Sequence, residues 1–198
     1  MNAPRRVVLA TGNAGKQREF AALLAPLGFE IITQGALGIA PAEEAGHTFE
    51  DNALLKARHA ARAANLPAMA DDSGIEVDAL HGRPGVHSAR YAGAAASDAD
   101  NNALLLAELA GRPPAARLAR YRCVIACVRF ADDPAPVYAR GVWEGRIATD
   151  PAGSGGFGYD PLFIPAGLDI TAAQMSAAAK NAVSHRAQAL AAVLRLMR

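Results

Sequence analysis

The sequence predicts an α/β fold, and the order of its strand and helix patterns carries the prediction. Residues 5–10, two arginines followed by an apolar run, look like a buried first strand. Residues 16–26 place apolar side chains at helical spacing, and residues 29–33 indicate a second short strand. This order is typical of the opening of an α/β domain. Residues 118–130 and 136–143 are strand-like runs around a turn, and they predict an antiparallel pair.

Length and composition fit one folded domain covering residues 1–198, with room for two lobes. Hydrophobic residues make up 52% of the chain and charged residues 20%, which is typical of a globular protein. The formal net charge of +1 gives no bulk attraction to a nucleic-acid polymer or to an acidic membrane. No apolar segment is long enough to cross a bilayer, so we expect neither kind of partner.

Capping and stop signals bound the remaining elements. Gly28 is a stop signal, and Thr48 with Asp51, like Ser97 with Asp100, marks a helix start. The predicted helices cover residues 16–26, from 48 to about 65, 97–111 and 184 onward, and further strands cover residues 66–69, 75–80, 145–149 and 161–164. The apolar side chains expected to face the core at the ends of the first and last helices are Leu27, Leu190, Val193, Leu194 and Met197.

The two cysteines, Cys123 and Cys127, lie in one strand-like run. Positions an even number apart share a face of a strand, so both are predicted to be buried small hydrophobic residues rather than metal ligands. The amino-terminal residues show no apolar signal core. We therefore expect a reducing, cytoplasmic setting.

Residues 11–15 form a loop between the first strand and the first helix. Backbone N–H groups at a helix start, together with the helix dipole, favour an anion, and Lys16 adds a positive charge. The loop is not a Walker A loop, which would need Gly at Ala10 and Ser or Thr at Gln17. It is therefore either a phosphate site or an ordinary turn with a solvated lysine.

Residues 70–74, Ala-Asp-Asp-Ser-Gly, are predicted to be an acidic turn at the end of a strand. Mg²⁺ binds a few carboxylates and shares its remaining positions with phosphates and water. Glu43 and Glu44 would complete such a site with Asp72 if the two segments meet, which spacing alone does not decide. The alternative is that residues 70–74 merely form a turn that ends a strand, and that Glu43 and Glu44 are a solvated acidic patch.

Glycine-rich residues 153–160 hold Phe157 in a loop. Glycine lets a backbone approach a ligand closely, and an aromatic ring there is suited to stacking on a nucleobase. The alternative is a tight turn with Phe157 packed in the core.

Residues 180–186 place Lys180, His185 and Arg186 at the expected start of the last helix. Cations at a helix start oppose the dipole, so a bound anion or a set of carbonyl oxygens would compensate them. The alternative is a Ser184 cap followed by solvated side chains.

Together these segments resemble the inosine triphosphate pyrophosphatase family (RdgB and Ham1-like proteins). The matching segments run collinearly along the chain at residues 11–16, 43–53, 70–80, 82–91, 155–163 and 184–186. The resemblance implies an elongated mixed β-sheet flanked by helices, two lobes with a nucleotide cleft between them, and a homodimer. It also implies Mg²⁺-dependent hydrolysis of ITP, dITP and XTP to the monophosphate and pyrophosphate, which keeps non-standard purines out of DNA and RNA.

The resemblance also assigns roles by motif. The implied substrate-binding residues are Thr11, Gly12, Asn13, Ala14, Gly15, Lys16, Ser73, Phe157, Gly158, Tyr159, Asp160, Lys180, His185 and Arg186. Thr11, Asn13 and Lys16 would hold the triphosphate, and Ser73 would contact the phosphates. Phe157 would stack on the base, and the last four residues of the list would read its edge. Asp72 would be the general base or water-orienting carboxylate and a metal ligand, with Glu43 or Glu44 as the other metal contact.

Hypoxanthine and xanthine carry a 6-oxo group and an N1–H where adenine has an amino group and a bare N1. A donor set such as His185 and Arg186 would therefore favour the oxo bases over ATP. Guanine shares both groups, so rejection of GTP must depend on its 2-amino group.

Two other functions are compatible with parts of the sequence. A Maf-like pyrophosphatase acting on dTTP or UTP would not be expected to carry the segments around Phe157 and at residues 184–186. A nucleotide-binding regulatory module without turnover would not need the paired carboxylates at residues 43–44 and 71–72.

Overall fold

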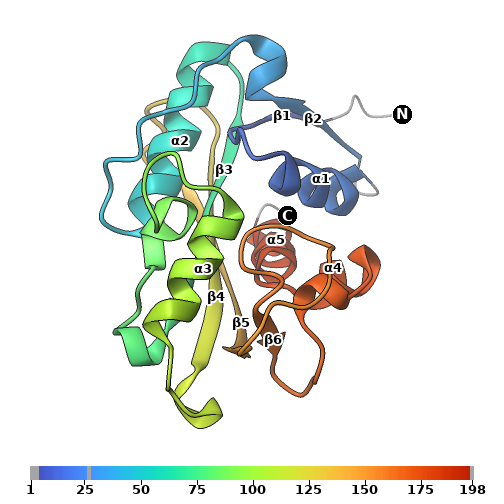
Figure 1. Ribbon diagram of the computed structural model, residues 1–198. Helices are drawn as coiled ribbons and strands as arrows, with labels where there is room; N and C mark the ends of the chain where they lie inside the picture. Colours follow the sequence, from blue (N-terminus) through green and yellow to red (C-terminus); the bar gives the residue numbers. More distant parts are fainter. Residues whose placement is uncertain (1–4, 26–27, 197–198) are drawn as a thin grey trace. The chain divides into compact units, whose positions relative to one another are not determined.

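The computed structural model describes residues 5–25 and 28–196 (Figure 1). Its strands are β1 (Arg5–Leu9), β2 (Phe29–Thr33), β3 (Ala68–Val77), β4 (Leu118–Val128), β5 (Val137–Ile147) and β6 (Phe163–Pro165). They form a six-stranded sheet in the order β2-β1-β3-β4-β5-β6. Strand β1 is parallel to β2 and β3, whereas β5 and β6 are antiparallel. The sheet is therefore mixed, as the family resemblance implied.

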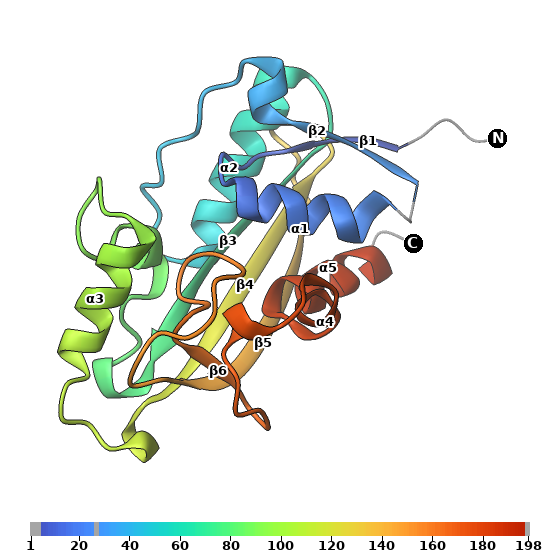
Figure 2. The same ribbon diagram turned by 45° about the vertical axis from the view of Figure 1, so that its right-hand side comes forward.

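Helices accompany the sheet, which confirms the α/β class (Figure 2). The α-helices are α1 (Ala14–Leu24), α2 (Phe49–Ala64), α3 (Asp98–Glu108), α4 (Ala177–Val183) and α5 (His185–Leu196). Short 3₁₀ helices cover Gln34–Leu37, Asp78–Leu80, Gly85–Arg90, Pro114–Ala116 and Ala172–Gln174. The predicted caps are correct, because the Thr48 side chain accepts from the backbone N–H of Asp51 and Ser97 forms a full capping box with Asp100.

The chain divides into two compact units. The first takes its described residues from 1–72, 123–141 and 187–198. Its buried core consists of Val7, Leu9, Phe20, Leu24, Met69, Cys123, Ile125, Cys127, Ala139, Ala189, Leu190 and Val193. Leu190 and Val193 thus face this core as expected. The expectations for Pro26, Leu27 and Met197 lie outside the described residues.

The second unit consists of residues 73–122 and 142–186 and has a separate core. Its buried members are Ile75, Val77, Leu80, Leu105, Leu109, Ala119, Tyr121, Trp143, Ile147, Tyr159, Leu162, Phe163 and Ala172. Aromatic contacts dominate its centre, where the rings of Tyr121 and Phe163 meet edge to face with centroids 4.7 Å apart. The strands β3, β4 and β5 each contribute residues to both units.

The expectation of a turn at residues 70–74 is wrong, because β3 runs through them without interruption. Gly74 does not reverse the chain. A Cβ atom there would lie 2.2 Å from the carbonyl oxygen of Gly85 and 2.5 Å from Ser88 Oγ. Ser88 Oγ instead accepts a hydrogen bond from the backbone N–H of Ile75 at 2.9 Å. The glycine therefore permits a close approach of residues 85–88 to the strand.

The separate third strand expected at residues 145–149 is also wrong, since β5 continues through to Ile147. Ala139, Gly141, Trp143 and Ile147 are buried at alternating positions, so the period of two persists across the expected break. Residues 145–147 pair with β6.

An additional short helix, α4, precedes the last helix and carries Lys180 in its final turn. The Ser176 side chain caps it by accepting from the backbone N–H of Ala179 at 3.2 Å. The expectation that Lys180 lies at a helix start is therefore wrong, because Lys180 lies in the last turn of α4. A cation at that end of a helix is favoured by the helix dipole. His185 does begin α5, with Arg186 next to it.

Both cysteines are free and buried, as predicted. Burial raises the pKa of the Cys127 thiol to about 12. Within the described ranges, no helix has the length and apolarity that a membrane span requires.

Candidate active site

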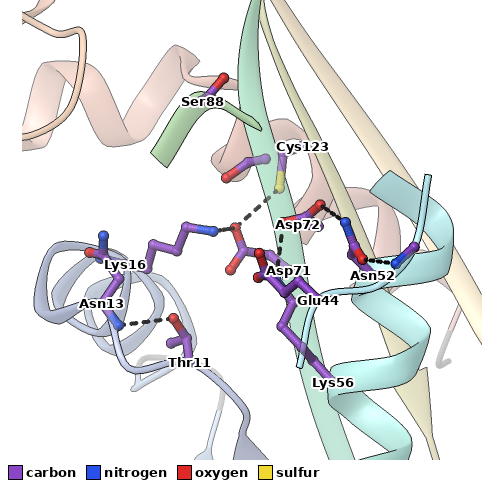
Figure 3. A network of polar contacts seen from close by, with 12 residues as sticks. Thr11, Asn13, Lys16, Glu44, Asn52, Lys56, Asp71, Asp72, Ser88 and Cys123 are labelled. Atoms are coloured by element: carbon purple, nitrogen blue, oxygen red, sulfur yellow. Dashed lines mark hydrogen bonds and ion pairs between the residues drawn. The ribbon is translucent and has the colours of Figure 1, made fainter. Parts of the chain in front are cut away.

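The two adjacent carboxylates of β3 both belong to the first unit and are nearly inaccessible, with Asp71 0% and Asp72 5% exposed. Neighbouring residues of a strand point to opposite faces, so the two side chains meet different partners. Lys16 Nζ of α1 lies 3.0 Å from Asp71 Oδ2, and Lys56 Nζ of α2 lies 3.0 Å from Asp72 Oδ1 (Figure 3). Each carboxylate is thus paired with a lysine from a different helix.

The second acidic segment meets Asp72 in the structure. Glu44 Oε1 lies 2.7 Å from Lys56 Nζ, so the carboxylates of Glu44 and Asp72 converge on one ammonium group. Glu43 is exposed. The Asn52 amide donates to Asp72 Oδ2 at 3.1 Å and accepts from the backbone N–H of Gly46 at 2.9 Å. Asn52 therefore ties the loop that carries Glu44 to the same side chain.

Burial and charge act in opposite directions on Asp72. Burial raises its pKa above the usual range, against the attraction of Lys56 and Lys16. For Lys56, burial lowers the pKa, but the charges of Asp72, Asp71 and Glu44 together raise it above its ordinary value. The cluster thus holds a charged lysine beside a carboxylate whose ionisation is costly, and a further cation would reduce that cost.

Glu44 and Asp72 suit a hard cation that takes few ligands from the protein. Within the described ranges, no three His, Cys, Asp or Glu side chains are grouped closely enough to hold a metal by themselves. Two carboxylates converging on one positive charge match Mg²⁺, which is completed by phosphates and water. The oxygen donors of Asp72 and Glu44 are of the type that Mg²⁺ binds, and it is Glu44 that shares Lys56 with Asp72.

The first loop is held by its own side chains. Asn13 caps α1 by accepting from the backbone N–H of Lys16 at 3.0 Å, and Thr11 Oγ1 accepts from the backbone N–H of Asn13 at 3.2 Å. Gly12, Asn13 and Ala14 are exposed, whereas Thr11 and Gly15 are buried. Lys16 is not the solvated lysine of the structural alternative, because its side chain is only 14% exposed and reaches Asp71. The loop presents an exposed helix start with a positive charge beside it.

A second group of predicted residues gathers in the second unit around Asp160, which is 1% exposed. Lys180 Nζ lies 2.5 Å from Asp160 Oδ2, and the same oxygen accepts from the backbone N–H of Phe157 at 2.9 Å. The Tyr121 hydroxyl donates to Asp160 Oδ1 at 3.4 Å. The buried charges of Lys180 and Asp160 therefore compensate each other.

Phe157 lies beneath two cationic side chains and is partly exposed. Lys180 Nζ is 4.8 Å and the Arg186 guanidinium carbon 5.7 Å from its ring centroid. Arg186 also donates to Ser73 Oγ at 2.9 Å. Ser73 thus belongs with Arg186 in this group, and its hydroxyl contacts a residue expected to read the base.

His185 and Tyr159 are both buried. The His185 ring stacks on Tyr121 with centroids 4.6 Å apart and planes at 6°. The Tyr159 ring is part of the core, and its hydroxyl donates to the backbone carbonyl of Ser88 at 2.8 Å. Gly158 lies between Phe157 and Tyr159 with a positive φ of 61°.

Three side chains that contact the predicted residues were not expected from the sequence. Lys56 and Asn52 lie within the predicted helix from residue 48 to about 65, and Tyr121 within the predicted strand at residues 118–130. Their spacing offers one usable signal, because Asn52 and Lys56 are four residues apart and so share a helix face. Tyr121 carries no such signal.

Comparison with known proteins places the chain in a family. The Ham1 family model matches residues 7–196. The dITP/XTP pyrophosphatases of Methylococcus capsulatus and Ralstonia nicotianae are 56% and 58% identical to the chain, covering 98% of it and 96% and 97% of their own lengths. A HAM1 protein from Coxiella burnetii has a similar structure, with a TM-score of 0.89, 44% identity, and coverage of 97% of this chain and 98% of that one. The chain belongs to the Ham1 family.

Proposed function

We propose that this chain is a nucleoside triphosphate pyrophosphatase that hydrolyses dITP, ITP and XTP to the monophosphate and pyrophosphate with Mg²⁺. Relatives named dITP/XTP pyrophosphatases, similar over nearly the whole chain, support the activity and substrate class. The observation that carries the chemistry is the convergence of Asp72 and Glu44 on Lys56 Nζ, at 3.0 and 2.7 Å. Paired carboxylates beside a lysine are suited to a phosphate substrate and its cation.

Asp72 and Glu44 would hold Mg²⁺, which when bound supplies positive charge that stabilises the pyrophosphate leaving group. Asp72 orients the attacking water and accepts its proton. A bond forms between the water oxygen and the α-phosphorus, and the bond from that phosphorus to the oxygen bridging to the β-phosphorus breaks. Burial raises the pKa of Asp72 in the metal-free protein, and a bound cation would favour its ionised form, which is the form that orients the water and accepts a proton.

The first loop and the lysines would bind the triphosphate. The exposed backbone of Gly12 and Ala14 lies at the start of α1, and Lys16 adds charge. Lys16 and Lys56 now pair with carboxylates, so binding of phosphates and Mg²⁺ would redistribute these contacts.

The second unit's group would bind the base. Phe157 supplies a ring for stacking, and Lys180 and Arg186 lie over the same ring as donors. His185, which is buried and stacks on Tyr121, would be a donor to the 6-oxo side, and Asp160 would be an acceptor next to Phe157. Adenine would leave donors facing its amino group, which favours ITP and XTP over ATP.

One assay tests the proposal: pyrophosphate release from ITP, dITP, XTP, dTTP, GTP and ATP, with Mg²⁺ and with the metal removed by a chelator. We expect release from the first three only, and only with Mg²⁺. Preference for dTTP would instead assign a Maf-like activity, and absence of release from every nucleotide would favour a binding module. Full activity after chelation would contradict the metal assignment.

We also propose that the protein is cytoplasmic and forms a homodimer. Two buried free thiols are compatible with a reducing compartment. Light scattering should give about twice the chain mass of 20.5 kDa. A mass equal to one chain would contradict the dimer.

A further inference from the structure

Two side chains from the N-terminal half of α3 contact the backbone of Gly158. Asp98 Oδ2 accepts a hydrogen bond from the backbone N–H of Gly158 at 2.6 Å. The Asn102 amide donates to the backbone carbonyl of Gly158 at 2.9 Å. Asp98 and Asn102 are four residues apart and therefore lie on the same helix face. The backbone N–H and the backbone carbonyl of Gly158 are thus both bonded to α3, which lies in the same compact unit as the loop.

The Asn102 amide is oriented by two acceptors. Its Nδ2 donates to the carbonyl of Asp98 at 2.8 Å as well as to that of Gly158. Only the nitrogen can serve two carbonyl oxygens, which fixes the amide orientation. Asn102 Oδ1 is buried and has no hydrogen-bond partner among the described residues. The hydrogen bonds of this side chain are therefore the two that its Nδ2 donates.

The loop of residues 153–160 depends on such hydrogen bonds because its own sequence gives it little rigidity. Four glycines lie between residues 153 and 158, and Gly156 and Gly158 have positive φ angles of 73° and 61°. From the core side, the Asp160 side chain accepts from the backbone N–H of Phe157 at 2.9 Å. The α3 contacts are made to the next residue, Gly158. Phe157 is therefore held between a core contact and a helix contact.

We propose that Asp98 and Asn102 are positioning residues that hold the Phe157 loop in its ligand-ready conformation. The proposal rests on the proposed function, in which Phe157 stacks on the purine. A loop that is already ordered avoids an entropy cost when the nucleotide binds. Substitution should therefore weaken nucleotide binding and leave the hydrolytic step at Asp72 unaffected.

The test uses the full-length enzyme with Asp98→Ala, Asn102→Ala and the double variant. Asp100→Ala is the matched control, because it removes an equal charge from the same helix turn and breaks the Ser97 capping box without touching the loop. Asp98→Asn is the conservative variant, since its amide oxygen still accepts from Gly158. The measurements are KM and kcat with ITP, and hydrogen exchange at residues 157–160 without nucleotide.

We expect the double variant to raise KM roughly two- to tenfold, the effect of one or two hydrogen bonds, with kcat near the wild-type value. Exchange at residues 157–160 should accelerate in the same variants. Asp98→Asn should restore both readouts, and Asp100→Ala should lower the melting temperature without changing either. If KM is unchanged, or changes equally in Asp100→Ala, the positioning role is wrong. A wild-type enzyme inactive on every deaminated purine triphosphate would overturn the proposed function, whereas an active wild type with unaffected variants overturns only this inference.

Discussion

At the scale of single residues, the candidate site is organised by two lysines that separate three carboxylates. Lys16 and Lys56 reach Asp71 and Asp72 from different helices, and Glu44 approaches Lys56. The family motif predicted Asp72, the glutamate pair and Lys16. Lys56 was missed because a lysine on an alanine-rich helix has the same appearance whether it is solvated or buried against a carboxylate. Only the packing of α2 beside β3 distinguishes these cases.

Asp72→Asn is expected to abolish pyrophosphate release while ITP binding remains measurable. An amide cannot accept the proton of the attacking water, and loss of a general base costs about 10²- to 10⁴-fold in rate. The measurement is kcat for ITP together with a binding titration. Asp78→Asn is the control, because Asp78 is an exposed carboxylate directly after the same strand. An active Asp72→Asn enzyme would refute the assigned role.

The same substitution should change stability in a pH-dependent manner in the metal-free protein. Burial raises the folded-state pKa of Asp72 above the unfolded value near 3.8. The stability that protonated Asp72 contributes is therefore fully present below the unfolded pKa and is lost as pH rises through the folded pKa. Asn cannot ionise, so Asp72→Asn should be more stable than the wild type at pH 7, and this advantage should shrink towards pH 3.5. Denaturant unfolding with a chelator at both pH values measures it. A variant that is less stable at pH 7 would mean that the pairing with Lys56 outweighs the burial.

Phe157→Ala is expected to raise KM for ITP, with about 1–3 kcal/mol of stacking lost, and to change kcat little. The ring is partly exposed and lies under Lys180 and Arg186, so its removal leaves no large core cavity. Phe157→Tyr keeps a stacking face and serves as the control. An unchanged KM with a lower melting temperature would assign Phe157 to packing instead.

At the scale of elements, local signals predicted the caps and most strands, and the errors have physical causes. Thr48 and Ser97 cap their helices because the side-chain acceptor is next in sequence to the amide that it serves. The acidic stretch at residues 70–74 predicts a turn because Asp, Ser and Gly favour turns in isolation. In the structure, its carboxylates are paired from α1 and α2, which no local pattern reports. Tertiary contacts therefore overrode propensity at the site itself.

Gly74→Ala should strongly destabilise the protein because of the segment packed against β3. An added Cβ would lie 2.2 Å from the carbonyl oxygen of Gly85, a backbone atom that cannot rotate away. Overpacking of this kind costs about 1–3 kcal/mol. Gly35→Ala is the control, because a Cβ there meets nothing within 4 Å and its φ is not positive. Thermal unfolding compares the two variants, and equal melting temperatures would show that residues 85–88 shift freely.

At the scale of the whole molecule, two cores belong to one chain whose middle strands take part in both. The units have separate buried clusters, yet β3, β4 and β5 each contribute residues to both. The sequence indicated an α/β domain with room for two lobes, but the division between the units falls inside strands. Gly141 lies at the division inside β5 and Gly74 lies near the division inside β3, but neither marks a linker, because the strands continue through both positions. A boundary of this kind is set by packing.

We expect the two units to unfold in one transition, since loss of either core would release residues of β3, β4 and β5 that continue into the other. The chain offers one probe for each core. Trp143 is the single tryptophan and belongs to the second unit, whereas Cys123 and Cys127 are the two cysteines and belong to the first. Burial of both thiols, and the raised pKa of Cys127, should prevent thiol labelling of the native state.

Urea unfolding followed by tryptophan fluorescence and by the rate of thiol labelling therefore tests the coupling. Coincident midpoints are the two-state result expected of a domain of this connectivity. Ala63→Cys, at an exposed position of α2, is the control: its thiol should be labelled rapidly at every urea concentration, including zero. Thiols that become reactive before the fluorescence changes would show that the first unit opens independently. In that case the acidic cluster on β3 would lose its lysine partners while the core around Phe163 and Trp143 remained folded.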